Sequence, residues 1–144
     1  MNVREIEDRQ AVLDFLTLSF YPYPWTMEGL ASHRILEISN DEVVGYVWFS
    51  ERTKGVMEIH VCVSPPFAGR WMSRALLLKL CDIGREIGTH TVVGLIDRPI
   101  IERIYRRLGA SIAGPFAILK IEDLYNGLYG SKDCSPRACS TPAA

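Results

Sequence analysis

The chain has 144 residues, of which 48% are hydrophobic, and a formal net charge of −1 at pH 7. A chain of this length and composition can bury a core without a metal ion or disulfide bonds. The near-neutral charge argues against nucleic acid as the main partner, and no apolar run approaches the roughly eighteen residues of a membrane span. Because the N-terminal residues also lack the apolar core of a signal peptide, we expect a cytoplasmic protein without a nucleic acid or membrane partner.

The cysteines give no sign of a metal site. Cys62 and Cys81 lie within apolar patterns that are typical of core residues, whereas Cys134 and Cys139 lie near the C-terminus. Since no second Cys or His pair accompanies them at zinc-site spacing, we expect no bound metal. Free thiols in a reducing compartment are the simplest interpretation.

The first elements in chain order are a short strand, a helix and an aromatic loop. Val3 to Ile6 predicts a strand, and Asp8 can cap a helix. The apolar positions of this helix recur at helical spacing and are Val12, Phe15, Leu16 and Phe20. The segment from Tyr21 to Trp25 contains two prolines and three aromatic residues, so it ends the helix and forms either a packed loop or the wall of a pocket. Thr26 to Ala31 predicts one further helical turn.

Three consecutive strands follow. They are predicted over His33 to Ser39, Glu42 to Ser50 and Val56 to Val63, because these segments are rich in β-branched and aromatic residues. The turn residues Asn40-Asp41 and Thr53-Lys54-Gly55 separate them, which predicts an antiparallel meander.

The remainder of the chain alternates helices and strands. Met72 to Ile87 carries an apolar stripe that ends before Gly88, and this pattern predicts a helix. Thr91 to Ile96 predicts a strand, and a last helix has its apolar stripe at Ile101, Ile104, Tyr105 and Leu108. Ser111 to Ile121 predicts two short strands that are broken near Gly114-Pro115.

The junction between the third meander strand and the following helix is the most informative segment. From Val63 to Leu77 a strand ends in a loop, and the loop leads directly into the helix. The unpaired N–H groups and the positive dipole end of a helix N-terminus favour a phosphate at such a position. Arg70 and Arg74 flank the loop and are candidates for phosphate contacts, whereas Arg103, Arg106 and Arg107 predict a solvated helix face.

Two segments resemble the GNAT superfamily of acyl-CoA-dependent N-acyltransferases. Residues 63–77 resemble the pyrophosphate loop and helix of that family, and residues 98–110 resemble its late helix with a tyrosine and a terminal Leu-Gly. The likeness covers about residues 3 to 121. It implies a GNAT-like α+β domain with a mixed, mainly antiparallel sheet of six to seven strands and about four flanking helices. We expect this domain to span residues 1–124, followed by a C-terminal extension over 125–144 that is flexible or docked on a partner.

The resemblance also implies roles for particular residues. Backbone groups near Val61 and Val63 would pair with the pantetheine arm of acetyl-CoA as an added strand does, and Tyr105 would protonate the departing thiolate. Loop and helix residues would hold the pyrophosphate through their N–H groups, namely Gly69, Arg70, Trp71, Met72, Ser73 and Arg74. Acetyl-CoA is then a co-substrate, and the acyl group passes directly to an amine without a covalent enzyme intermediate.

The loop departs from the family pattern. Ala68, Trp71 and Ser73 stand where the family has Arg or Gln, Gly, and Gly or Ala. Trp71 is the largest change, because an indole beside the diphosphate path must either turn outward or fill the cleft. We expect an active site to require the outward orientation.

The sequence offers two candidates for the general base, and both lie on the same predicted strand. Glu58 is the preferred candidate and His60 the second, since either can take a proton from an ammonium group. In an unbroken strand, Glu58 and His60 share a face with Cys62. The base of the family usually lies on the opposite face, where this strand has Met57 and Ile59. A β-bulge is therefore needed to bring Glu58 to the site. The alternatives are that Glu58 is an ordinary strand carboxylate and that Tyr105 only packs.

Two classes of function remain. The chain is an N-acetyltransferase that acts on a small-molecule or protein amine, or it is a catalytically inert GNAT-fold module, such as a phage virion-associated protein. In either case a homo-oligomer or a larger assembly is possible. Fold alone does not separate the two classes, because function depends on the site.

Overall fold

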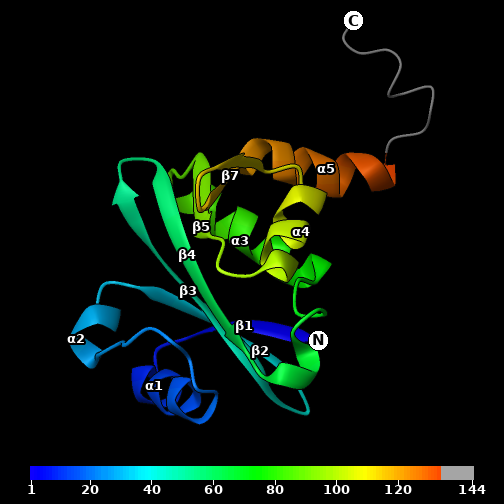
Figure 1. Cartoon of the computed structure of the whole chain (residues 1–144). Coiled ribbons are helices and arrows are strands. Elements are labelled where there is room, and N and C mark those ends of the chain that lie inside the picture. Colours follow the sequence, from blue (N-terminus) through cyan, green and yellow to red (C-terminus); the bar gives the residue numbers. More distant parts are fainter. Residues whose placement is uncertain (134–144) are drawn as a thin grey trace, which may run out of the picture.

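The structure of the protein is a computed structural model that describes residues 1–133 (Figure 1). Its strands are β1 (Asn2–Ile6), β2 (Arg34–Asn40), β3 (Glu42–Thr53), β4 (Val56–Val63), β5 (Thr91–Leu95), β6 (Ser111–Ala113) and β7 (Phe116–Lys120). Its helices are α1 (Arg9–Leu18), α2 (Met27–Leu30), α3 (Arg74–Ile87), α4 (Pro99–Arg107) and α5 (Ile121–Asp133), with a 3₁₀ turn over Pro65–Phe67. The prediction of a mixed α/β fold is confirmed.

One seven-stranded sheet carries the domain, in the order β1-β2-β3-β4-β5-β7-β6. Neighbouring strands are antiparallel except β4 and β5, which are parallel and are joined through α3. A parallel pair needs a crossover connection, and α3 supplies it. The two short strands predicted on either side of Gly114-Pro115 are also present as β6 and β7, which pair directly.

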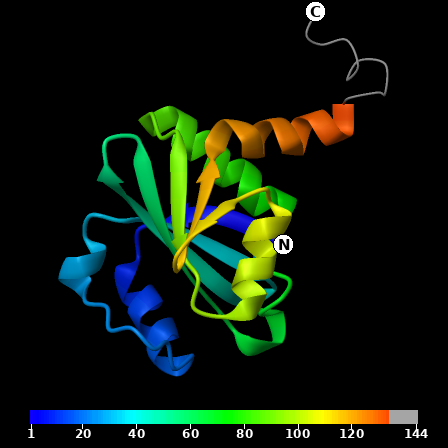
Figure 2. The ribbon, with the colours of Figure 1, turned by 45° about the horizontal axis from the view of Figure 1, so that its top comes forward.

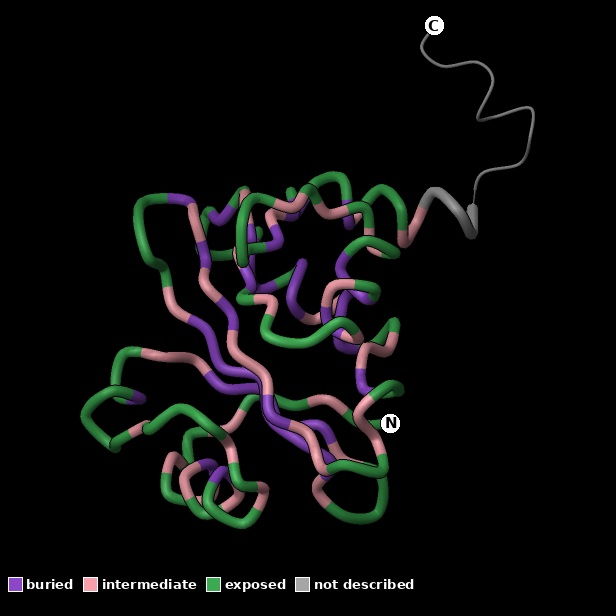
Figure 3. Tube along the Cα trace, in the orientation of Figure 1, coloured by how far each residue is buried: buried purple, intermediate pink, exposed green. Residues whose placement is uncertain are grey.

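Each face of the sheet is covered by its own set of helices (Figure 2). Met57 and Ile59 of β4 point into the core beneath α3, α4 and α5, whereas Cys62 of the same strand packs with residues of α1 and α2. Side chains alternate between the faces because the period of a strand is two, and the central strands are therefore buried on both sides (Figure 3).

The parallel pair separates partway along its length. β4 pairs with β5 only from Val56↔Thr91 to Ile59↔Gly94, whereas the pairing of β4 with β3 continues to Val63. Beyond Gly94, β5 keeps its other neighbour, β7. The last four residues of β4 therefore have no strand on the β5 side, which leaves a gap in the sheet (Figure 1).

Two expectations about helix boundaries are corrected. Phe20 is not on the stripe of α1, which ends at Leu18; it has a φ of 53° and is 91% exposed. α3 begins at Arg74 and not at Met72, because the hydroxyl of Ser73 caps the helix by accepting a hydrogen bond from the N–H of Leu76 at 3.2 Å.

The expected domain boundary at residue 124 falls inside a helix. α5 runs through this position, and its residues Ile121 and Leu124 are buried in the core with α3. The part of the expected extension from residue 134 onward, with Cys134 and Cys139, lies outside the described residues. Of the helices within residues 1–133, none is long and apolar enough to cross a membrane.

Candidate active site

The gap between β4 and β5 exposes backbone hydrogen-bonding groups. The N–H of Ser64 donates to the carbonyl of Val44 on β3 at 2.8 Å. Because successive N–H groups of a strand point to opposite neighbours, those of Val61 and Val63 point away from β3 and into the gap. These are the residues for which the family resemblance implied an added-strand contact with a ligand.

A cavity of about 260 Å³ lies at this gap. Its walls come from β4, β5, α4, the loop before α3 and the loop between α1 and α2. The lining residues are Tyr21, Tyr23, Pro24, Trp25, Ile59, His60, Val61, Val63, Trp71, Leu95, Asp97, Arg98, Ile101 and Tyr105. Ile59 belongs to the core cluster under α3, whereas Trp25 packs in the cluster under α1 and α2. The cavity is thus bounded by residues from both faces and passes through the sheet at the gap.

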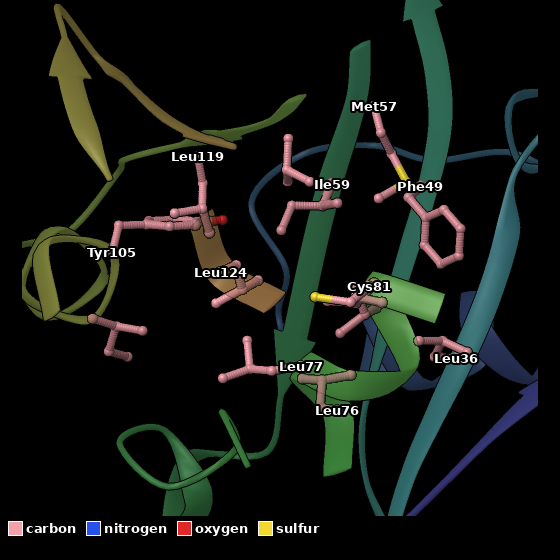
Figure 4. Packing of buried hydrophobic residues seen from close by; sticks show 14 of the residues in the cluster. Leu36, Phe49, Met57, Ile59, Leu76, Leu77, Cys81, Tyr105, Leu119 and Leu124 are labelled. Carbon is pink, nitrogen blue, oxygen red and sulfur yellow. The ribbon is translucent and has the colours of Figure 1, made fainter. Parts of the chain in front are cut away.

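Tyr105 projects from α4 with its hydroxyl directed toward Ile59 of β4 (Figure 4). A methyl group at Gly94, the last β5 residue paired with β4, would overlap the Tyr105 hydroxyl, so only glycine permits this approach. Burial raises the pKa of the Tyr105 phenol, and the negative charge of Asp97 adds to the rise. The phenol therefore keeps its proton at neutral pH, as a proton donor must.

Of the two candidates for the general base, His60 lines the cavity and Glu58 does not. β4 has no bulge, since its pairing with β3 shifts only at Glu51/Thr53 of β3. The Glu58 carboxylate instead pairs with Arg52 and lies 3.4 Å from the His60 Nε2. Burial lowers the pKa of His60, although Glu58 opposes the shift, so the imidazole is neutral and able to accept a proton at neutral pH.

The loop before α3 offers some, but not all, of the expected donors. The N–H of Arg70 is bonded to the Phe67 carbonyl and that of Ser73 to the Trp71 carbonyl, both at 2.9 Å. Of the six expected donor positions, residues 69–74, the N–H groups of four have no hydrogen-bond partner among the described residues, namely Gly69, Trp71, Met72 and Arg74. A Cβ at Gly69 would meet no atom within 4 Å, so the loop is open at this point.

Trp71 does not turn outward. Its side chain is 1% exposed, packs in the core cluster under α3 and lines the cavity without filling it. The outward orientation that we expected of an active site is therefore not found, although the buried indole leaves the cavity open. Among the described residues the indole N–H has no hydrogen-bond partner, a cost of about 1–3 kcal/mol that an acceptor on a ligand would relieve.

The two candidate phosphate-binding arginines are engaged elsewhere on the protein surface. Arg70 donates to the Pro66 carbonyl at 3.0 Å and lies over the Phe67 ring, whereas Arg74 donates to the Leu128 carbonyl of α5 at 2.7 Å. Both side chains are exposed, so either can exchange these contacts for a ligand.

Sequence reasoning missed part of the site. It left the aromatic segment open between packing and a pocket wall, and the structure places Tyr21, Tyr23 and Trp25 on the cavity. It did not single out Asp97, which lies two residues after the end of β5; the signal available was a carboxylate just beyond the carboxyl end of a strand. Within residues 1–133, no group of three or more His, Cys, Asp or Glu side chains is arranged to hold a metal ion.

The comparisons with known proteins agree with this geometry. The model of the acetyltransferase (GNAT) family matches residues 1–110. Similar solved structures include a GNAT superfamily phosphinothricin acetyltransferase from Sinorhizobium meliloti in complex with AcCoA, with 16% identity, a TM-score of 0.66 and coverage of 83% of this chain and 87% of that one. The GNAT family N-acetyltransferase YhbS from Escherichia coli in complex with CoA has 20% identity, a TM-score of 0.62 and coverage of 90% and 84%.

A ribosomal-protein-alanine N-acetyltransferase from Brucella melitensis is similar as well, with 16% identity, a TM-score of 0.62 and coverage of 83% of this chain and 97% of that one. No curated protein matches the sequence. At these identities the solved structures show the fold alone. Because the family model covers most of the chain, the protein belongs to the GNAT acetyltransferase family.

Proposed function

We propose that the protein is an N-acetyltransferase that transfers the acetyl group of acetyl-CoA to a primary amine by direct attack. One observation carries the proposal: a single cavity crosses the sheet at the β4/β5 gap and has a neutral imidazole, His60, and a protonated phenol, Tyr105, on its walls. These are the two functions that acyl transfer to an amine requires, a base for the nucleophile and an acid for the leaving group.

The residues at the gap fit acetyl-CoA as a substrate. The pantetheine arm is an amide chain, and it would pair with the free N–H groups of Val61 and Val63. The diphosphate would lie at the loop before α3, where Gly69 and Met72 offer free N–H groups and Arg74 begins the helix. The exposed Arg70 side chain can add a contact to this surface, the Ser73 N–H can do so only by giving up its bond to the Trp71 carbonyl, and Trp71 forms the inner wall.

The chemistry follows from the two titratable groups. An acceptor ammonium gives a proton to His60, and the resulting imidazolium is stabilised by the Glu58 carboxylate 3.4 Å away. The free amine attacks the thioester carbonyl, the N–C bond forms and the C–S bond breaks. Tyr105 donates its proton to the departing sulfur and recovers one from the nitrogen, so the balance is one amide, one thiol and one proton released to solvent. In this assignment Glu58 is a positioning residue, not the base.

The cavity also bears on the alternative of an inert module. Such a module would be favoured if the Trp71 indole filled the cleft, but an open volume of about 260 Å³ remains. We further propose a cytoplasmic location, where the buried thiols of Cys62 and Cys81 stay reduced.

The proposal is tested by acetyl-CoA binding and by CoA release. Titration calorimetry should give a binding heat with acetyl-CoA, and the ligand should raise the Tm, because a ligand that binds the native state stabilises it. Thiol release in the presence of a panel of primary amines should exceed the rate without amine. If millimolar acetyl-CoA gave neither heat nor a thermal shift, the enzyme assignment would be abandoned in favour of the module.

A further inference from the structure

The cavity has two chemically different halves. On the α3 side its walls are the apolar residues of β4 and α4 together with Trp71 and Tyr105. On the α1/α2 side they are the aromatic strap, which we define as residues 21–25, together with His60. Since the proposed thioester arm follows the edge of β4, the strap side is where an acceptor would enter and meet the base.

Aromatic contacts hold the strap against the sheet. The ring of Trp25 lies edge-on to Trp48 at 5.6 Å and to His60 at 4.9 Å between centroids, and Tyr21 lies edge-on to Trp48 at 5.6 Å. Trp48 is fully buried in the sheet, so these contacts tie the strap to the core. Aromatic faces held in place bind an apolar group, and they also attract the positive charge of an ammonium.

Charged groups are few on the lining. Among the described residues that form the cavity walls, only Asp97 and Arg98 carry a full charge, and they form a 3.6 Å ion pair with each other. Burial raises the pKa of both Tyr21 and Tyr105, and in each case the charge of Asp97 adds to the rise. Asp97 therefore lines the cavity within electrostatic reach of both of its halves.

From this arrangement we infer that the acceptor is a primary monoamine with an apolar or aromatic body, whose ammonium is held by Asp97 and whose body packs against the strap at Tyr23 and Trp25. This inference rests on the proposed acetyl transfer, because it names the class of acceptor for that same site.

Other amines fit this lining less well. A polyamine carries further cations, and within the described lining there is no second carboxylate to receive them. An amino acid brings a carboxylate, which would have to take Arg98 away from Asp97. The volume of about 260 Å³ lies just below the roughly 300–1,000 Å³ of drug-sized sites, which favours a small acceptor.

Three probes separate these classes. Phenylethylamine, with its amine on the terminal carbon, is the monoamine; phenylalanine adds a carboxylate to the same body, and 1,4-diaminobutane replaces the aromatic body by a second cation. Each is titrated into the full chain by calorimetry, with and without CoA, and each is then compared as an acceptor by thiol release with acetyl-CoA. We expect phenylethylamine to bind more tightly than either of the others and to have the highest kcat/KM.

Asp97→Asn tests the residue assignment. It should raise both the Kd and the KM for phenylethylamine on the order of tenfold, since a hydrogen bond to a charged group is lost. The KM for acetyl-CoA should not change. The variant also frees Arg98, so the discrimination against phenylalanine should shrink. Asp82→Asn, which alters an exposed carboxylate of α3, is the matched control and should change none of these values.

The possible results distinguish a failure of this inference from a failure of the proposed function. Stronger binding of phenylalanine or of the diamine, or equal amine binding by wild type and Asp97→Asn, overturns the inference even if acetyl-CoA binds and is turned over. Conversely, if phenylethylamine binds through Asp97 but acetyl-CoA does not bind, the acetyltransferase proposal fails while the cavity remains a monoamine site.

Discussion

At the scale of single residues, the environment of His60 decides which group can act as a base. The imidazole is stacked on Trp48 and packed against Trp25, with a carboxylate on one side. Burial among aromatic rings disfavours the charged form, so the pKa lies below the ordinary value of 6.5. A base of this kind is unprotonated at neutral pH and is ready to receive a proton.

His60→Gln should lower kcat/KM by about 10²-fold, because glutamine cannot accept the proton. The pH profile gives a sharper measurement. In the wild type, kcat/KM should fall as the pH drops through the His60 pKa, below 6.5, since the imidazole then becomes protonated. In the variant this acidic limb should disappear.

His33→Gln is the matched control for that experiment. Burial also lowers the pKa of His33, and its ring lies 6.0 Å from that of His60, yet His33 does not line the cavity. The control should keep the acidic limb. If both variants lost it, or if Glu58→Gln alone removed it, the assignment of the base to His60 would be wrong.

From the sequence, the choice of general base could be narrowed to two residues of one strand, but not to one of them. Alternation correctly predicted that Glu58 and His60 share a face, and the structure has no bulge in β4 to change it. What separates the two residues is the aromatic strap and the end of β5 pairing at Gly94, and both are contacts between distant segments. Such contacts leave no trace in the local pattern of β4.

At the scale of elements, β5 and α4 together determine where the Tyr105 hydroxyl lies. α4 begins with Pro99 and carries Tyr105 on its buried stripe, and β5 offers Gly94 beneath the ring. The position of the hydroxyl thus depends on the absence of a side chain on a neighbouring strand.

Gly94→Ala should therefore resemble Tyr105→Phe. Each variant should lower kcat by about tenfold or more while the KM for acetyl-CoA changes little, because a proton donor contributes to the transition state and not to ground-state binding. The double variant should be no slower than Tyr105→Phe alone, since both changes act on one hydroxyl. Gly127→Ala, at a helical glycine with open space around it, is the control and should keep full activity.

Additive losses in the double variant, or equal kcat values for wild type and Tyr105→Phe at every pH, would assign Tyr105 to packing. A Tm measured for each variant separates a displaced hydroxyl from a poorly folded domain, because Gly94 lies within a paired strand.

The type of each element was predictable where the sequence pattern is strong, whereas the residues at which helices begin and end were predicted less accurately. The meander follows from its β-branched and aromatic composition and its turn residues, and α3 and α4 follow from apolar spacing. Phe20 has the spacing of α1, but the helix ends at Leu18 and the strap leaves in another direction, with Phe20 in the left-handed region. The buried orientation of Trp71 was not predictable either, because it depends on how the loop packs against β4 and α4.

At the scale of the whole molecule, the hydrophobic cores on the two faces of the sheet both border the cavity at the β4/β5 gap. The site exists because β5 leaves β4 after Gly94 and the cavity connects the two faces there. The α3 face is larger and includes α5, whose Tyr125 ring lies 3.5 Å from the Arg85 guanidinium carbon of α3. α5 therefore supports the helix that carries the proposed phosphate loop, and we propose that the domain extends through it.

This proposal predicts that a chain ending at residue 124 is less stable than one ending at residue 133. The shorter chain loses the partly buried side chains of Tyr125 and Leu128, and with Leu128 the carbonyl that holds Arg74. Loss of this apolar contact should lower the free energy of unfolding by about 2 kcal/mol. Urea denaturation of both chains under the same conditions measures the difference, and the pair is matched because both lack residues 134–144. Equal midpoints and slopes would restore the boundary at residue 124, whereas a lower midpoint for the shorter chain places α5 within the domain.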